Sequence, residues 1–161
     1  MLSIIYMFSY IYSFLFSKIY GIKIFEFFYN IVYNEGYMIK ILMVDDEIFA
    51  RDAMAKIISK KGFDVVVAST GEEGLKLFKE EQPDVVFLDV MLPDLDGDNL
   101  FDYIKEIKND VTVYFITGSE LIFTPETAKQ QGAKGYLKKP VELNELFNVL
   151  AEIKEMFGDK I

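Results

Sequence analysis

The sequence predicts an α/β fold, a doubly wound sheet of parallel strands. Short apolar runs recur along the chain, and apolar residues at helical spacing fill the segments between them. The runs that we interpret as buried strands are Ile39–Val44, Asp64–Ala68, Val85–Leu88, Val113–Ile116 and Gly135–Lys138. Strands that are separated by helices pair in parallel and are buried on both faces, which explains their nearly continuous apolar character.

The first two helices are predicted from spacing and from residues that start and stop helices. The segment Glu47–Lys60 carries an apolar stripe, and Gly62 follows it as a residue suited to a helix end. The stripe consists of Ala50, Ala53, Met54, Ile57 and Ile58. The next helix starts from an N-cap within Ser69–Thr70–Gly71, buries Leu75 and Phe78, and stops at Gln82–Pro83.

Three further helices are predicted in the second half of the chain. After a loop from Val90 to Gly97, a helix should place Leu100, Tyr103, Ile104 and Ile107 on one face. A short helix is expected to begin near Pro125 and to stop at Gly132. The last helix, which ends before Gly158, carries the stripe Leu143, Leu146, Phe147, Leu150 and Ile153.

Five strands alternating with five helices favour one topology. Because parallel crossovers are right-handed, we expect the flavodoxin-like (βα)5 arrangement with strand order 2-1-3-4-5. In such a sheet, ligands bind where the carboxyl ends of the strands meet.

Polar residues stand at these strand ends. They are the pair Asp45–Asp46, the single Asp89, Thr117 and Lys139. Carboxylate oxygens are preferred ligands of Mg²⁺, and an ammonium and a hydroxyl can bind phosphoryl oxygens. The sequence therefore predicts a site for a divalent cation and a phosphoryl group.

From Met38 to about Phe157 the chain resembles the receiver domains of response regulators in two-component signalling. The resemblance rests on four motifs in the order found in the family. They are Val44-Asp45-Asp46-Glu47, Leu88-Asp89-Val90-Met91-Leu92-Pro93 with Asp96-Gly97, Ile116-Thr117-Gly118, and Gly135-Tyr136-Leu137-Lys138-Lys139-Pro140.

The resemblance assigns a role to each site residue. Asp89 corresponds to the phosphoacceptor, which takes a phosphoryl group from a phosphohistidine. Asp46, Asp89 and the backbone carbonyl of Met91 are expected to bind Mg²⁺, and Asp45 to hold a metal-bound water. Lys139 is expected to pair with Asp89. The peptide bond at the position of Lys139–Pro140 is cis in the family, so we expect it to be cis here.

Thr117 and Tyr136 are the expected switch residues. Thr117 donates its hydroxyl to the phosphoryl group, and Tyr136 turns inward once Thr117 has moved. Neither Met91 nor Ser119, at the two positions that tune phosphoryl lifetime in the family, carries an acid or amide to orient water, so we expect slow self-dephosphorylation.

The same resemblance implies partners. The phosphodonor is a sensor histidine kinase or a histidine phosphotransfer protein, and an unidentified output protein binds the face formed by the fourth helix, the fifth strand and the fifth helix. The acidic composition, with a net charge of -9, gives no basic patch, so we expect no nucleic-acid partner. The chain has no cysteine and no histidine, which excludes zinc sites built from these residues and fits the cytoplasm.

The composition divides the chain into a hydrophobic, aromatic-rich extension, residues 1–37, and a receiver domain, residues 38–161. The charged residues of the extension, Lys18, Lys23, Glu26 and Glu35, cancel one another. We favour a mis-assigned start, with Met38 as the true first residue, because the codons of Glu35–Gly36 form a purine-rich stretch before it. A membrane anchor that holds the receiver in the cytoplasm and an amphipathic or partner-binding helix are the alternatives.

Two other functions compete with the signalling receiver. A phosphatase of the haloacid-dehalogenase type also uses an Asp nucleophile and Mg²⁺, but it needs Asp-x-Asp after its first strand, where this chain has Asp45–Asp46. A degenerate receiver that serves only as a scaffold would lack the acceptor or the lysine, whereas Asp89 and Lys139 are both present. The chain is therefore expected to be a signalling domain with phosphotransfer activity rather than a classical enzyme.

Overall fold

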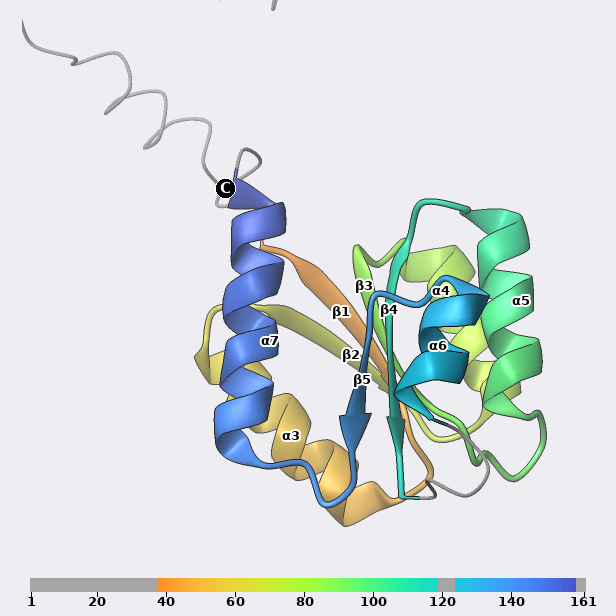
Figure 1. Cartoon of the computed structure of the whole chain (residues 1–161), viewed down its shortest axis with the longest axis horizontal. Coiled ribbons are helices and arrows are strands. Elements are labelled where there is room, and N and C mark those ends of the chain that lie inside the picture. Colours follow the sequence, from red (N-terminus) through yellow and green to blue (C-terminus); the bar gives the residue numbers. More distant parts are fainter. Residues whose placement is uncertain (1–37, 119–123, 159–161) are drawn as a thin grey trace, which may run out of the picture. The chain divides into compact units, whose positions relative to one another are not determined.

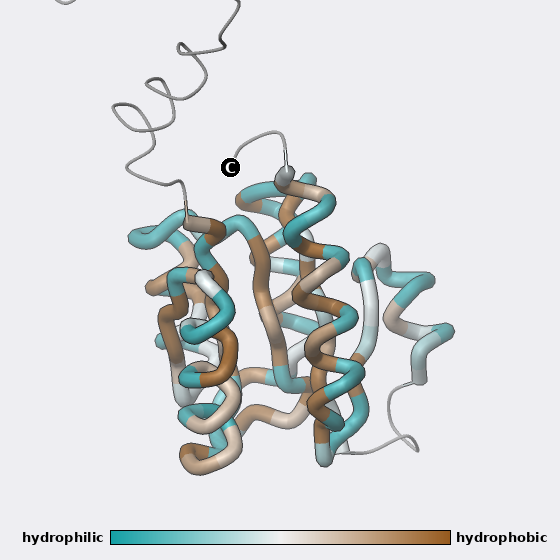
Figure 2. The backbone as a smooth tube through the Cα atoms, turned by 90° about the vertical axis from the view of Figure 1, so that its left-hand side faces the viewer, coloured by the Kyte–Doolittle hydropathy of each residue, from teal (hydrophilic) through white to brown (hydrophobic). Residues whose placement is uncertain are grey.

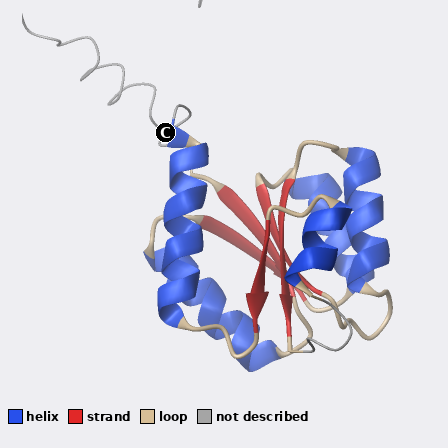
Figure 3. Cartoon of the chain, in the orientation of Figure 1, coloured by secondary structure: helices blue, strands red, loops and turns tan. Residues whose placement is uncertain are grey.

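The computed structural model describes residues 38–118 and 124–158. Strands and helices alternate along this part of the chain (Figures 1 and 3). The strands are β1 Lys40–Val44, β2 Asp64–Ala68, β3 Val85–Asp89, β4 Thr112–Thr117 and β5 Gly135–Lys138. The helices are α3 Ile48–Lys60, α4 Gly71–Glu81, α5 Gly97–Ile107, α6 Pro125–Gln131 and α7 Leu143–Met156.

The strands form one parallel sheet in the order β2-β1-β3-β4-β5, which confirms the predicted topology. The register aligns the carboxyl ends of the inner strands. Val44 pairs with Leu88, Asp89 with Ile116, and Thr117 with Lys138. The residues that directly follow β1 and β5 therefore lie at the same edge of the sheet as Asp89 and Thr117.

Helices cover both faces of the sheet, with α3 and α7 on one side and α4, α5 and α6 on the other (Figure 1). Successive residues of a strand point to opposite faces, so β1 sends Leu42 toward α4 and α5 and Met43 toward α3 and α7. Figure 2 shows the helices alternating between hydrophobic and hydrophilic residues, as expected when one face of each packs on the sheet.

The ends of the helices follow the sequence signals closely. Thr70 caps α4 by accepting a hydrogen bond from the backbone N–H of Glu73, and α4 ends at Gln82, which has a positive φ of 50°. Gly132 ends α6 with φ 89°, and Gly62 follows α3 with φ 88°. The peptide bond between Lys139 and Pro140 is cis, as expected.

The predicted apolar stripes are wrong in part. In α5, Tyr103 and Ile107 are exposed, and the helix buries Phe101 together with Leu100 and Ile104. The buried stripe is therefore rotated toward Phe101, whose ring packs against Phe115 of β4 at a centroid distance of 5.2 Å.

Similar departures occur in α3 and α7, at the ends nearest the predicted site. Ala50 and Ala53 are exposed in α3, where Arg51 is buried beside Met54 and Ile58. In α7 the first residue of the predicted stripe, Leu143, is exposed. Ala50, Ala53 and Leu143 instead line a pocket that also includes Asp45 and Lys139.

The predicted extension, residues 1–37, lies outside the described residues. Among the helices that the structure does describe, none has the length and apolar character needed to cross a membrane.

Candidate functional site

Most of the predicted site residues meet at the carboxyl edge of the sheet. Asp45 follows β1, Asp89 ends β3, Thr117 ends β4 and Lys139 follows β5. Asp45 and Thr117 are fully buried, and Asp89 is 3% exposed. The backbone N–H of Lys139 donates to the carbonyl of Thr117 at 2.8 Å, which continues the pairing of β4 with β5 up to the lysine.

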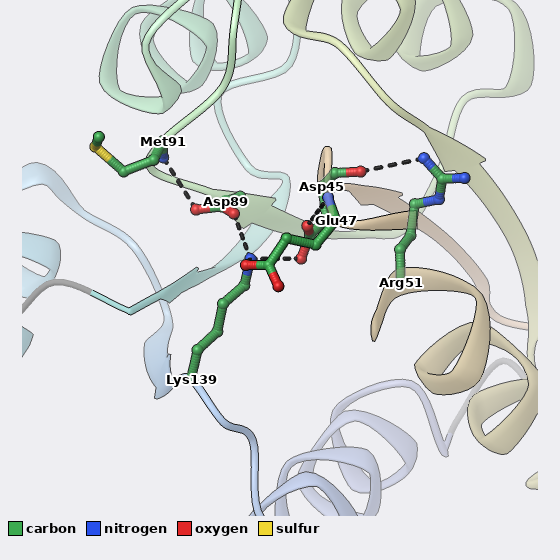
Figure 4. A network of polar contacts seen from close by, with 6 residues as sticks. All are labelled: Asp45, Glu47, Arg51, Asp89, Met91 and Lys139. Carbon is green, nitrogen blue, oxygen red and sulfur yellow. Dashed lines mark hydrogen bonds and ion pairs between the residues drawn. The ribbon is translucent and has the colours of Figure 1, made fainter. Parts of the chain in front are cut away.

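The ammonium of Lys139 is the centre of the site (Figure 4). Its Nζ lies 2.5 Å from Oδ2 of Asp89, 2.9 Å from Oδ2 of Asp45 and 2.9 Å from Oε1 of Glu47. Burial of the ammonium lowers the pKa of Lys139, but hydrogen bonds to Asp89, Asp45 and Glu47 outweigh this effect, so the pKa lies above its ordinary value. Lys139 is therefore a permanent cation in the site, whereas the neighbouring Lys138 is exposed.

The carboxyl group of Asp89 is held at both oxygens. Oδ2 accepts from Lys139, and Oδ1 accepts from the backbone N–H of Met91 at 2.9 Å. Burial nevertheless raises the pKa of Asp89 above its ordinary value, and the charge of Asp45 adds to the rise, while Lys139 and the Met91 amide oppose it. Burial therefore outweighs the stabilisation of the charged form by Lys139 and the Met91 amide.

The loop after β1 is fixed by its own hydrogen bonds. Oδ1 of Asp45 accepts from the backbone N–H of Glu47 at 2.8 Å, and the carbonyl of Asp45 accepts from the buried guanidinium of Arg51 at 3.2 Å. The guanidinium also binds Asp52 on the same helix. Arg51 thus explains why a charged residue interrupts the apolar face of α3: it anchors the loop that carries the aspartate pair.

Three carboxylates approach closely enough to share a cation. One oxygen each from Asp45, Glu47 and Asp89 can be chosen so that all lie within 4.8 Å of one another. This set of hard oxygen ligands fits Mg²⁺. The same carboxylates contact Lys139, so a metal ion bound among them would compete with the ammonium.

Glu47 was not predicted as a site residue, and Asp46 is not part of this cluster. Asp46 is exposed, and its expected role as a metal ligand stays a prediction. Glu47 stands in the motif after the aspartate pair, but its reach to Lys139 depends on how α3 begins. The carbonyl of Met91 lies on the loop after Asp89, and Ser119 is outside the described residues.

The expected switch residues occupy neighbouring strands. Tyr136 on β5 pairs in register with Phe115 on β4 and is partly buried against the core beneath α4, α5 and α6. Thr117 lies two residues further along β4. Because residues two apart on a strand point to the same face, Thr117, Phe115 and Tyr136 lie on one face of the sheet.

Comparison with known proteins identifies the family. A family model for the response regulator receiver domain matches residues 41–151 of the chain. The chain belongs to the receiver domain family of response regulators. This membership confirms the resemblance found in the sequence and does not support the haloacid-dehalogenase alternative.

The curated relatives are regulators rather than classical enzymes. The chain is 40% identical over 107 residues to a probable transcriptional regulator of Guillardia theta, covering 66% of this chain and 42% of that protein. It is 36% identical over 107 residues to the alkaline phosphatase synthesis transcriptional regulatory protein PhoP of Bacillus subtilis, covering 66% of this chain and 45% of that protein. The receiver thus spans less than half the length of these relatives.

Solved structures confirm the fold. A TM-score of 0.70 with 32% identity relates the chain to the N-terminal domain of an uncharacterized protein from Wolinella succinogenes, covering 76% of this chain and 99% of that chain. A CheY-like receiver domain protein from Methanospirillum hungatei matches with a TM-score of 0.67 and 27% identity, covering 76% and 96% of the two chains.

These relatives bear on the expected partners. Receiver domains of response regulators interact with sensor kinases. Because named relatives are transcriptional regulators, the expectation that the chain has no nucleic-acid partner is not supported.

Proposed function

We propose that the chain is a phosphoacceptor response regulator: Asp89 takes a phosphoryl group from a phosphohistidine of a sensor histidine kinase or histidine phosphotransfer protein, and the switched domain binds an output partner. The observation that carries this proposal is the buried carboxylate of Asp89, held between the ammonium of Lys139 and the amide of Met91. The domain acts in the cytoplasm, where we expect the kinase to present its phosphohistidine.

The proposed transfer exchanges one bond for another. A carboxylate oxygen of Asp89 attacks phosphorus, the P–N bond of the phosphohistidine breaks, and the imidazole leaves with the electron pair. Lys139 offers its ammonium to a phosphoryl oxygen as a point charge, at the position where it now binds Oδ2. The amide of Met91 keeps the carboxyl group oriented throughout.

Mg²⁺ is the cofactor in this proposal. Asp46, Asp89 and the carbonyl of Met91 are the proposed ligands, with Asp45 holding a metal-bound water. When bound, the ion neutralises the negative charge that the acceptor and the phosphoryl group bring together. Glu47 joins the candidate ligands because its carboxylate lies with those of Asp45 and Asp89.

Phosphorylation is proposed to change the surface through Thr117 and Tyr136. Thr117 donates its hydroxyl to the phosphoryl group, and the space that it leaves admits Tyr136. The output protein binds the face formed by α6, β5 and α7, which includes Tyr136. We expect slow self-dephosphorylation, because the side chain of Met91 cannot orient a water molecule.

Intact-mass measurement tests the acceptor. After treatment with acetyl phosphate and Mg²⁺, the chain should gain one phosphoryl group, and it should gain none when the metal is chelated. Asp89→Asn should gain none under either condition, because the amide is not a nucleophile. Asp96→Asn is the matched control, since this exposed acid follows the same strand but lies outside the carboxylate cluster.

Two results would count against this assignment. Phosphorylation of Asp89→Asn at the wild-type level would place the acceptor elsewhere. A wild-type chain that folds, binds Mg²⁺ and accepts no phosphate from either acetyl phosphate or a kinase would instead favour the scaffold function.

A further inference from the structure

The loop between β3 and α5, residues 90–96, carries the carbonyl of Met91 and is tied down at its two ends. The backbone N–H of Val90 donates to the carbonyl of Ile116 at 3.3 Å, and the N–H of Gly97 donates to the carbonyl of Val90 at 3.0 Å. Between these points Leu92 is buried in the core with residues of α5, and the more exposed segment that follows it depends on a contact with another element.

Asp94 supplies that contact by capping a helix from outside it. Its Oδ1 accepts from the N–H of Gly71 at 2.8 Å, and its Oδ2 accepts from the N–H of Glu72 at 2.9 Å. The next amide, that of Glu73, donates to the local cap Thr70 at 3.2 Å. The first amides of α4 are thus satisfied by two residues, one of which belongs to the site loop.

Neighbouring residues make this link stiff. Leu95 packs so closely on the start of α4 that a Cβ added at Gly71 would lie 2.7 Å from the Cβ of Leu95. Pro93, which stands between Met91 and Asp94, fixes its own φ and removes one rotatable bond from the segment. Hydrogen bonds from the amide of Glu72 lower the pKa of Asp94, so the carboxylate stays ionised well below neutral pH.

We propose that Asp94 is a positioning residue that uses the N-terminus of α4 to aim the Met91 carbonyl at the cation site. The proposal rests on the proposed function, in which this carbonyl is a metal ligand. Asp94 itself touches neither the metal nor the phosphoryl group. It acts as an outer partner of a ligand, and loss of such partners typically weakens metal binding by about 10- to 100-fold.

The test is calorimetric titration of the full chain with Mg²⁺, comparing Asp94→Ala with Thr70→Ala. Both substitutions remove a cap from the same end of α4 and should lower the melting temperature. Only Asp94→Ala releases the site loop, so only this variant should bind Mg²⁺ more weakly, by about tenfold. Asp94→Asn retains one acceptor oxygen, which can serve one of the two amides, so its Mg²⁺ affinity should lie between those of Asp94→Ala and the wild-type chain.

Each outcome has one meaning. Equal Mg²⁺ affinity in Asp94→Ala, Thr70→Ala and the wild-type chain would overturn the positioning role and leave the proposed function intact. Failure of the wild-type chain itself to bind Mg²⁺ would overturn both. If Asp94→Ala does not melt cooperatively, Asp94→Ser replaces it, because its short hydroxyl can accept at most one of the two hydrogen bonds. The Mg²⁺ affinities of Asp94→Ser and Thr70→Ala are then compared in the same way.

Discussion

At the scale of single residues, Glu152 on α7 shows how one exposed charge joins three parts of the fold. Its Oε2 accepts from the hydroxyl of the buried Tyr114 on β4 at 3.0 Å, and its Oε1 pairs with Lys134, before β5, at 2.8 Å. The hydrogen bond from Lys134 lowers the pKa of Glu152 most, burial opposes it, and the hydrogen bond from Tyr114 adds to the lowering, so the pKa lies below its ordinary value. Burial and the negative charge of Glu152 raise the pKa of Tyr114, which keeps its hydroxyl a donor.

This network predicts a pH dependence. Because the folded-state pKa of Glu152 lies below its unfolded value of 4.5, its stabilising contribution is present above that pH and is lost as the pH falls through the folded value. Glu152→Gln should be less stable than the wild type at pH 7 by about 0.5 kcal/mol, since the pair with Lys134 is exposed and screened. Urea denaturation at pH 7 and below pH 4 measures the difference in the free energy of unfolding between the two chains. The difference should vanish in acid and shrink in high salt, and a constant difference would show that packing dominates.

The predicted site was largely visible in the sequence because strand ends are easy to locate. Asp89, Thr117 and Lys139 each stand at the end of an apolar run, and parallel pairing brings those ends together. Glu47 could not be assigned in this way. Its contact with Lys139 crosses 92 positions of sequence and depends on the angle at which α3 leaves the loop.

At the scale of elements, Gly97 controls how closely α5 approaches the end of β3 at Asp89. A Cβ at this position would overlap the carbonyl oxygen of Asp89 and lie 2.8 Å from the Cα of Val90. Both neighbours are backbone atoms, which cannot rotate out of the way as a flexible side chain could. The first residue of the helix and the backbone at Asp89 therefore fix each other.

Gly97→Ala should consequently harm both folding and the site. We expect a loss of about 1 to 3 kcal/mol in the free energy of unfolding, as for other overpacked positions, because the backbone at Asp89 must shift. Urea denaturation measures the loss, and acetyl phosphate labelling should become slower in the fraction that remains folded. Gly158→Ala is the control, because a Cβ there meets nothing within 4 Å. Equal stability of the two variants would show that α5 moves away easily.

The apolar stripes show where sequence patterns stop being reliable. In α5 the sequence offers Phe101, Tyr103 and Ile107 around two turns, and periodicity does not decide which of them the sheet covers. The structure buries Phe101 because Phe115 of β4 provides a partner ring, which is a contact between distant segments. The bounds of β2 and β5 were predicted correctly, and those of the other strands to within one residue at each end, because the apolar runs and the residues that flank them mark these bounds in the sequence.

At the scale of the whole molecule, the sheet and both of its apolar cores are made by residues within 38–118 and 124–158. Residues Met38–Asp159 form a compact unit of their own. We therefore predict that a chain beginning at Met38 unfolds cooperatively on heating and accepts phosphate as the full chain does. Calorimetry and intact-mass measurement test this. Loss of the cooperative transition would mean that residues 1–37 belong to the fold, against the proposed domain boundary at residue 38.

Phosphorylation of Asp89 should change the surface formed by α6, β5 and α7. A ligand shifts a two-state equilibrium only through contacts that differ between the states, and the proposed differential contacts are those of Thr117 and Lys139 with phosphoryl oxygens. A minor state populated at about 0.1 to 10% becomes dominant with a few kcal/mol of such contacts. Beryllofluoride, a mimic of the acyl phosphate, should therefore change NMR signals at Tyr136 and along α7 as well as around Asp89. Asp89→Asn should show none of these changes. If the wild-type changes stay within the loops around Asp89, the output face is not coupled to the acceptor, while the assignment of Asp89 itself is unaffected.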